Sequence, residues 1–337
     1  MKQTPRTLVV SLVLLGLLCL LWFSLGSSES ERLLAKRIKV SRTVAEAVRL
    51  GKPVVALEST VITHGGLGFP RNLLTGQALE NEIRTNGAVP ATIAIIDGYI
   101  RVGLDQEELE FLAKSTVAVK CSKRDLGAAV ALRWTGSTTV AATMFAAHAA
   151  GIEIFATGGM GGVHHGAFSG ELSSLDVSAD LIELAQTPVM VVCAGVKSIL
   201  DVQGTLEWLE TLGVPVASLN SPSFPQFFTQ TSGLKSPLNL KSPLEAARVF
   251  RVNKQLGVGT GMVLAVPNRN PVPGIERIIE QAVNDAKQQQ VIGKEVTPFV
   301  LRRVAELSGG ESIKSNIELL LNNAKVAAAV AVEYHNE

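Results

Sequence analysis

The chain has 337 residues, is 47% hydrophobic, and carries 31 lysines and arginines against 30 aspartates and glutamates. A chain of this length and composition can bury one large core or two smaller ones, so we expect a folded globular protein. The near balance of charge excludes the broad basic face that duplex DNA or RNA requires, and a nucleic acid polymer is therefore not an expected partner. Three widely spaced cysteines exclude a CxxC zinc site or a disulfide framework.

The first predicted element is an apolar run over residues 8–25, preceded by Lys2 and Arg6. At about 18 residues it is longer than most signal-peptide cores and just long enough to span a bilayer as a helix. Small residues near its end suit signal cleavage, whereas the basic flank suits an anchor whose N-terminus stays cytosolic. Residues 1–29 are therefore expected to be a signal peptide or a membrane anchor, which leaves membrane attachment and compartment open. Residues 30–337 are expected to form the catalytic domain.

From Val40 onward, short β-branched runs bounded by Gly and Pro alternate with Ala-rich helical stretches. This alternation predicts an α/β protein, an α/β/α layered fold with a mostly parallel central sheet. The predicted strands are residues 53–57, 91–96, 116–119, 153–156, 189–193 and 262–265. The predicted helices are residues 73–86, 139–150, 178–185, 199–212, 275–289, 296–307 and 316–333. The Pro- and Ser-rich stretch 218–242 is interpreted as a lid or a boundary, and an irregular insertion in one domain is favoured.

The first predicted strand ends in a carboxylate, Glu58, which two hydroxyl residues and the turn at His64 follow. Ligands of open α/β sheets bind beyond the carboxyl ends of the strands. A buried Glu58 there could act as a general acid or base with a raised pKa. A helix-capping or salt-bridged glutamate explains the residue equally well.

Two later stretches are suited to hold an anion. Residues 136–139 open the predicted helix 139–150 with hydroxyls and free N–H groups at a positive helix end. The glycine-rich residues 156–166 follow a strand and expose many backbone N–H groups, without a Walker or dinucleotide-binding pattern. Ordinary N-capping and a plain flexible loop are the alternatives. His164 and His165 could bind phosphate or metal, although such surface pairs are common.

Asp176 and Asp180 lie four residues apart, so on one helical turn both carboxylates would face the same way. Hard cations such as Mg²⁺ or Mn²⁺ favour this oxygen-rich setting. The alternative is that one of the pair caps the helix.

Lys197 follows a fully apolar strand just before a predicted helix, which is an unusual place for lysine. Desolvation there disfavours the ammonium form and frees an amine that can form a Schiff base with a carbonyl. A lysine that snorkels to solvent or pairs with Asp201 is the alternative.

Together these segments resemble the pseudouridine-5'-phosphate glycosidase family, from about Val40 to the end of the chain. The resemblance rests on VVALEST at 54–60, GAVPATIA at 87–94, ATGGMGGVH at 156–164, VCAGVKSILD at 192–201 and GKEVTPF at 293–299. Matches of this length and order are highly specific.

The resemblance implies reversible cleavage of the C–C glycosidic bond of pseudouridine 5'-phosphate to uracil and ribose 5-phosphate, a step of pseudouridine catabolism. It implies Lys197 as the Schiff-base nucleophile, Glu58 as the proton donor and Asp176 as the ligand of one Mn²⁺ per subunit. The substrate-binding residues that it implies are Lys120, Thr139, Val140, His164, Ser178, Ala179, Asp180 and Asn316. A homotrimer and a separate kinase that supplies the substrate are also implied.

A lysine suits this reaction because a carbon leaving group cannot simply be protonated like the oxygen or nitrogen of an ordinary glycoside. Hydrolysis by two carboxylates would be inadequate. The expected route opens the ribose ring, forms a C1' imine with Lys197 as an electron sink, and transfers protons through Glu58.

The chain departs from the family pattern in three places: a turn at 64–70 that is one residue longer, an insertion at 171–174, and Val266 where the family has asparagine. One alternative function is a lyase or glycosidase that acts on another phosphorylated sugar or nucleotide. A second is a catalytically silent, membrane-tethered binding protein. The presence of Glu58, Asp176 and Lys197 together argues against the silent protein.

Overall fold

The computed structural model describes residues 36–165, 167, 176–291 and 293–336. The chain divides into two compact units, residues 1–39 and 40–337, and the parallel strands all belong to the second unit. Within the described residues, no helix is both long enough and apolar enough to cross a membrane. The predicted apolar run 8–25, and with it the signal or anchor predicted for residues 1–29, lies outside the described residues.

The strands are β1 (Ile38–Val40), β2 (Val54–Leu57), β3 (Val89–Ile96), β4 (Tyr99–Val102), β5 (Val119–Cys121), β6 (Gly136–Thr138), β7 (Ile154–Ala156), β8 (Val163–His164), β9 (Met190–Cys193), β10 (Leu200–Asp201), β11 (Val216–Leu219), β12 (Leu238–Leu240) and β13 (Met262–Ala265). The helices are α2 (Arg42–Arg49), α3 (Thr60–Thr63), α4 (Arg71–Thr85), α5 (Gln106–Lys114), α6 (Leu126–Ala131), α7 (Val140–Ala149), α8 (Ala179–Gln186), α9 (Val202–Thr211), α10 (Pro243–Gln255), α11 (Ile275–Gln288), α12 (Val296–Leu307) and α13 (Glu311–Asn336). Single 3₁₀ turns form at Lys123–Asp125 and Gly293–Glu295.

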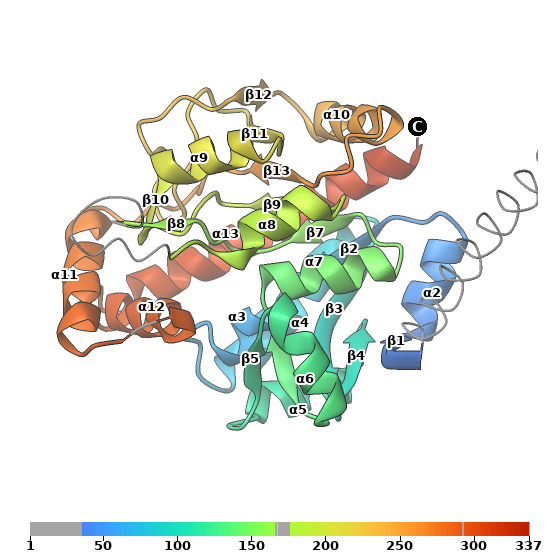
Figure 1. The fold of residues 1–337 in the computed structure, drawn as a ribbon, viewed down its shortest axis with the longest axis horizontal. Coiled ribbons are helices and arrows are strands. Elements are labelled where there is room, and N and C mark those ends of the chain that lie inside the picture. The colour runs from blue at the N-terminus through green and yellow to red at the C-terminus, as the bar shows by residue number, and fades with distance from the viewer. Residues whose placement is uncertain (1–35, 166, 168–175, 292, 337) are drawn as a thin grey trace, which may run out of the picture. The chain divides into compact units, whose positions relative to one another are not determined.

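The central sheet has the strand order β4-β3-β2-β7-β9-β13-β11-β12 (Figure 1). Every pair from β3 to β12 is parallel, while β4 and β6 run antiparallel to β3. Strands β8 and β10 form a separate antiparallel pair. The predicted α/β fold with a mostly parallel central sheet is therefore confirmed.

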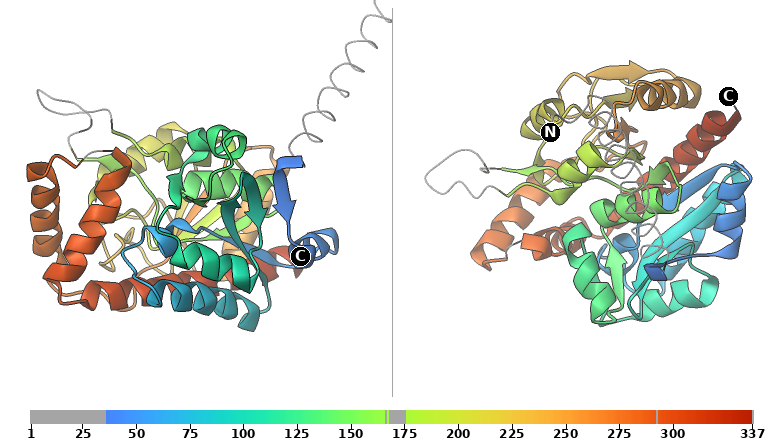
Figure 2. Two further views of the ribbon diagram at one scale, coloured as in Figure 1. Left: turned by 90° about the horizontal axis from the view of Figure 1, so that it is seen from below. Right: turned by 45° about the vertical axis from the view of Figure 1, so that its right-hand side comes forward.

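Helices cover both faces of this sheet, which explains the uninterrupted apolar sequences of its central strands. Every residue of β2, β7, β9 and β13 is buried, as strands covered on both faces require. Helices α4, α10 and α13 pack together on one face, and α7, α8 and α9 follow one another on the other. Figure 2 shows α13 and α4 side by side beneath the sheet.

Three predicted element boundaries are wrong for local reasons. The strand predicted at 116–119 is displaced to β5, because the chain turns after α5 and leaves Val117 78% exposed. The helix predicted from residue 316 begins at Glu311, directly after Gly309 and Gly310, whose positive φ angles separate α12 from α13. The helix predicted from residue 199 begins at Val202, because β10 precedes it.

The Pro- and Ser-rich stretch 218–242 contains the end of β11, the loop that follows it and β12, all within the second unit, so it is not a domain boundary. Its irregular backbone is secured by three buried aromatic side chains, Phe224, Phe227 and Phe228. The rings of Phe227 and Phe228 meet edge to face with their centroids 4.7 Å apart. This segment therefore packs into the hydrophobic core, and through Phe227 it also lines the cavity described below.

Candidate active site

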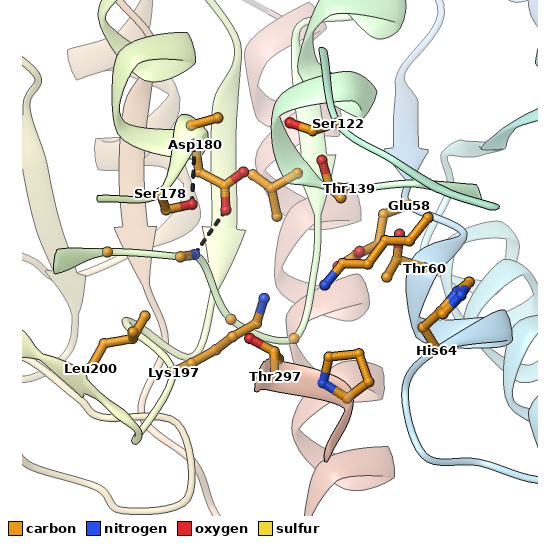
Figure 3. Close-up of a pocket in the computed structure, with 18 of the residues that line it drawn as sticks. Glu58, Thr60, His64, Ser122, Thr139, Ser178, Asp180, Lys197, Leu200 and Thr297 are labelled. Carbon is orange, nitrogen blue, oxygen red and sulfur yellow. Dashed lines mark hydrogen bonds between the residues drawn. The ribbon is translucent and has the colours of Figure 1, made fainter. Parts of the chain in front are cut away.

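A cavity of about 330 Å³ opens beyond the carboxyl ends of the parallel strands. All the predicted site residues line it: Glu58, Lys120, Thr139, Val140, His164, Asp176, Ser178, Ala179, Asp180, Lys197 and Asn316. Figure 3 shows the side chains of Lys197, Asp180, Glu58 and Thr139 around the same space. Residues far apart in the sequence thus form one site, as the topology of a parallel sheet predicts.

The register of the central strands places Glu58 beside Thr157. Leu57 pairs with Ala156 across β2 and β7, so the next residue of each strand also lies side by side. The Thr157 hydroxyl donates a hydrogen bond to the Glu58 carboxylate. Burial raises the pKa of Glu58, and the positive charge of Lys197 partly opposes this increase. A glutamate with a raised pKa at a cavity wall is suited to donate a proton near neutral pH.

Lys197 lies on a tight loop after β9. Gly195 has a φ of +86°, and a Cβ there would lie 3.0 Å from the carbonyl carbon of Pro225, so only glycine fits. The backbone N–H of Lys197 donates to the Met160 carbonyl at 3.1 Å, which ties this loop to the glycine-rich loop. The Lys197 side chain points into the cavity (Figure 3).

The alternative pairing of Lys197 with Asp201 is not the arrangement found, because Asp201 caps α9. The Asp201 carboxylate accepts a hydrogen bond from the backbone N–H of Gly204 at 2.9 Å. The side chain of Lys197 instead lines the cavity.

Asp180 connects the glycine-rich loop to the N-terminus of α7. One carboxylate oxygen accepts a hydrogen bond from the N–H of Gly161 at 2.9 Å, and the other accepts one from the N–H of Ala141 at 3.0 Å. The side chain is 6% exposed. Hydrogen bonds from two backbone donors satisfy the buried carboxylate.

The prediction that Asp176 and Asp180 share one helical turn is wrong. Ser178 has an extended backbone and caps α8, which begins at Ala179, so Asp176 lies before the helix. Its carbonyl accepts a hydrogen bond from the N–H of His164 at 3.0 Å, and its carboxylate lies 3.8 Å from Nδ1 of that histidine. Both carboxylates line the cavity, but Asp180 is bonded to two backbone N–H groups, whereas Asp176 lies beside His164.

Several features at the start of α7 are suited to an anion. Thr139 is the N-cap residue, but its hydroxyl makes no capping bond and has no hydrogen-bond partner in the described part of the chain. The residues before it form β6, so the predicted helix opening at 136–139 is correct only for Thr139. The N–H groups of the first helical turn carry partial positive charge, although that of Ala141 already donates to the Asp180 carboxylate. Burial, with the charge of Lys197, lowers the pKa of the nearby Lys120 to about 8.

The histidines differ in setting. His164 lines the cavity, and burial lowers its pKa although Asp176 opposes the shift. His165 is exposed. Within residues 36–165, 176–291 and 293–336, no three His, Cys, Asp or Glu side chains are grouped closely enough to hold a metal by themselves.

The cavity also contains residues that the sequence did not indicate. Ser122 and Arg124 lie beside Lys120, and Phe227, Thr297 and Leu301 form another part of the wall. Ser122 and Arg124 belong to no sequence motif described above, whereas Thr297 belongs to the segment 293–299 that carried the family resemblance. Phe227 reaches the cavity from the long loop between β11 and β12.

The three places where the sequence departs from the family pattern differ in whether they lie at the cavity. Residues 64 and 65 of the longer turn line the cavity. Val266 is 4% exposed in the hydrophobic core and does not line the cavity, so the missing amide there removes no cavity contact. The insertion at 171–174 lies outside the described residues.

Comparisons with known proteins agree with this geometry. The family model described as indigoidine synthase A like protein matches residues 43–333. Pseudouridine-5'-phosphate glycosidase 2 of Rhizobium johnstonii is 50% identical over 88% of this chain and 96% of its own. The pseudouridine-5'-phosphate glycosidase of Caldanaerobacter subterraneus is 48% identical over the same shares.

Two solved structures have the same fold. A prealnumycin C-glycosynthase in complex with ribulose 5-phosphate matches with a TM-score of 0.80 and 34% identity, over 89% of this chain and 97% of its own. An indigoidine synthase A-like protein of Thermotoga maritima matches with a TM-score of 0.77 and 34% identity, over 88% and 96%.

Proposed function

The chain belongs to the indigoidine synthase A-like family, and we propose that it is a pseudouridine-5'-phosphate glycosidase that reversibly cleaves pseudouridine 5'-phosphate to uracil and ribose 5-phosphate. The observation that carries the proposal is that one cavity contains the amine of Lys197, the carboxyl group of Glu58 and the N-terminal end of helix α7. Relatives that are 48–50% identical to this chain are named for this activity.

The phosphate is bound where positive charge gathers. The backbone N–H of Val140 at the N-terminus of α7 is the proposed main-chain donor, since the N–H of Thr139 already donates to the Cys121 carbonyl, and Lys120 provides a cation. The unpartnered Thr139 hydroxyl supplies a further donor. Ser178, Ala179, Asp180, His164 and Asn316 are the proposed contacts for the sugar and the base.

The reaction uses Lys197 and Glu58 in sequence. The C1'–O4' bond breaks as the ribose ring opens and the Lys197 amine bonds to C1', and the proton that the amine loses ends on O4' as a hydroxyl. The C1'–uracil bond then breaks, and a proton from Glu58 takes the place of C1' on the uracil carbon. C1' is left as an imine on Lys197. Water hydrolyses the imine, which releases ribose 5-phosphate and restores the free lysine.

Mn²⁺ is proposed as the metal, with Asp176 as its protein ligand. The Asp176 carboxylate is 43% exposed at the cavity, and this single hard donor suits a cation that takes its other ligands from water and substrate oxygens. Asp180 is less suited as a ligand, because each of its oxygens already accepts a hydrogen bond from a backbone N–H group. When bound, the metal would orient water and substrate groups electrostatically.

The assay is uracil release from pseudouridine 5'-phosphate by residues 31–337 with Mn²⁺, beside Lys197→Ala and borohydride trapping of a ribose adduct. We expect wild type to release uracil and to be trapped, and Lys197→Ala to do neither. Circular dichroism confirms that both proteins are folded.

If folded wild type releases no uracil, the substrate assignment is wrong. A panel of other phosphorylated sugars and nucleotides then tests the alternative reaction, since the C-glycosynthase relative was solved with ribulose 5-phosphate. Omitting Mn²⁺, and replacing Asp176 with asparagine, should each lower the rate if the metal assignment is right.

Assembly and membrane attachment are separate proposals. We expect a homotrimer, which sedimentation equilibrium would measure. Residues 8–25 are proposed to be cleaved or to anchor the chain, and fractionation of cells that express the full chain distinguishes a shortened protein from a membrane-bound one.

A further inference from the structure

Asn323 places an amide group inside the apolar interface between α13 and the sheet. It is completely buried, among apolar neighbours that include Leu319, Leu320 and Ala327 of the same helix. A buried amide costs free energy unless hydrogen bonds compensate for its lost hydration. Its Oδ1 atom has no hydrogen-bond partner in the described residues, so the compensation is incomplete. The role of this asparagine therefore lies in what its amide nitrogen contacts.

The amide nitrogen of Asn323 binds the backbone at the start of the glycine-rich loop. Nδ2 donates to the Thr157 carbonyl at 2.8 Å and is 3.3 Å from the Gly158 carbonyl. Gly158 permits this close approach, because a Cβ there would lie 3.2 Å from Cδ2 of Leu320. Asn323 does not line the cavity, so it acts on the site only through these backbone groups.

The same backbone is also bound by β9 and by Ala194, the residue that follows it. The Thr157 N–H donates to the Val192 carbonyl at 3.0 Å, and the Gly158 carbonyl accepts from the Ala194 N–H at 2.8 Å. Hydrogen bonds from α13 and from the strand region beside it therefore hold both the N–H and the carbonyl of Thr157. Its hydroxyl is the group that donates to the Glu58 carboxylate.

We propose that Asn323 is a positioning residue that fixes the proton donor Glu58 through Thr157. The inference deepens the proposed function and rests on it for the role of Glu58. Three charged groups also face Glu58, namely Lys197, Lys120 and Asp180. None of these is bound to Asn323, so a substitution there changes the hydrogen bond to Glu58 and leaves the surrounding charges in place.

The test compares Asn323→Leu, Thr157→Val and the double variant in the full chain. We expect Asn323→Leu to lower kcat for uracil release about tenfold, with KM within about twofold of wild type. Loss of the Thr157 hydrogen bond removes a stabiliser of the ionised carboxylate, so the alkaline limb of the kcat profile moves to higher pH in both single variants. The double variant should be no slower than Thr157→Val, because both substitutions break one chain of contacts.

The matched control is Thr92→Val, which removes another buried hydrogen bond, from Thr92 to Glu80, between residues that do not line the cavity. It should lower stability and leave kcat unchanged. Borohydride trapping of ribose 5-phosphate on Lys197 should persist in every variant. An unchanged kcat and pH profile in Asn323→Leu, or a double variant that loses the product of both single effects, overturns the inference.

A substrate-independent readout separates this inference from the proposed function. Infrared titration, with Glu58→Gln as the reference, measures the pKa of Glu58 directly. We expect Asn323→Leu and Thr157→Val to raise it by the same amount. If that pKa rises while wild type releases no uracil, the contact chain stands and the proposed reaction fails; if it does not rise, the inference fails even when wild type is active.

Discussion

Replacing Gly161 with alanine tests how closely Asp180 and Ser178 hold the glycine-rich loop. An added Cβ would lie 2.6 Å from Cβ of Ser178 and 2.8 Å from Oδ2 of Asp180, distances that real contacts do not reach. Relief of this overlap costs about 1–3 kcal/mol. It also breaks the 2.9 Å hydrogen bond from Gly161 to the Asp180 carboxylate, which contributes about 1.5–3 kcal/mol. We therefore expect a loss of about 2.5–6 kcal/mol in the free energy of unfolding.

Equilibrium urea unfolding measures this loss, with uracil release assayed on the same preparation. Gly127→Ala in α6 is the control, because its Cβ would meet no atom within 4 Å. There we expect a gain of about 0.5–1 kcal/mol and unchanged activity. The close packing of this loop would be refuted if the Gly161→Ala protein kept full activity and its free energy of unfolding were within about 0.5 kcal/mol of that of wild type.

Three further predictions concern other parts of the molecule. Because Lys120, with a pKa of about 8, loses its charge as the pH rises, kcat/KM should fall above that pH, and Lys120→Arg should lack this limb; an identical profile in both proteins would contradict the phosphate role. Asn72→Ala leaves buried carbonyls of α3 and α5 without the side-chain donor that reaches them at 3.0 and 2.8 Å, and should cost about 2–4 kcal/mol in urea unfolding. Asp105→Ala removes the capping box of α5 and should lower stability by about 1 kcal/mol, whereas Asp105→Asn should retain most of it.

The sequence alone predicted the strands β2, β3, β7, β9 and β13 and the positions of the two main chemical groups, but it did not predict β4, β6, β11 or β12. Uninterrupted apolar runs predicted parallel strands covered on both faces, because only such strands have no polar side. Glu58 and Lys197 were identified as candidates because each follows one of those runs, and side chains just beyond parallel strands meet at one edge of the sheet. Both predictions depend on local patterns of a few residues.

Tertiary structure decided how those groups are held. Asp176 and Asp180 have a spacing that suits one helical turn, yet the extended backbone of Ser178 starts the helix after Asp176. The hydrogen bond from Thr157 to Glu58 joins residues 99 positions apart, and the one from Asn323 to Thr157 joins residues 166 positions apart. No local pattern contains such pairs, because strand register and the packing of α13 against the sheet bring them together only after the whole core has formed.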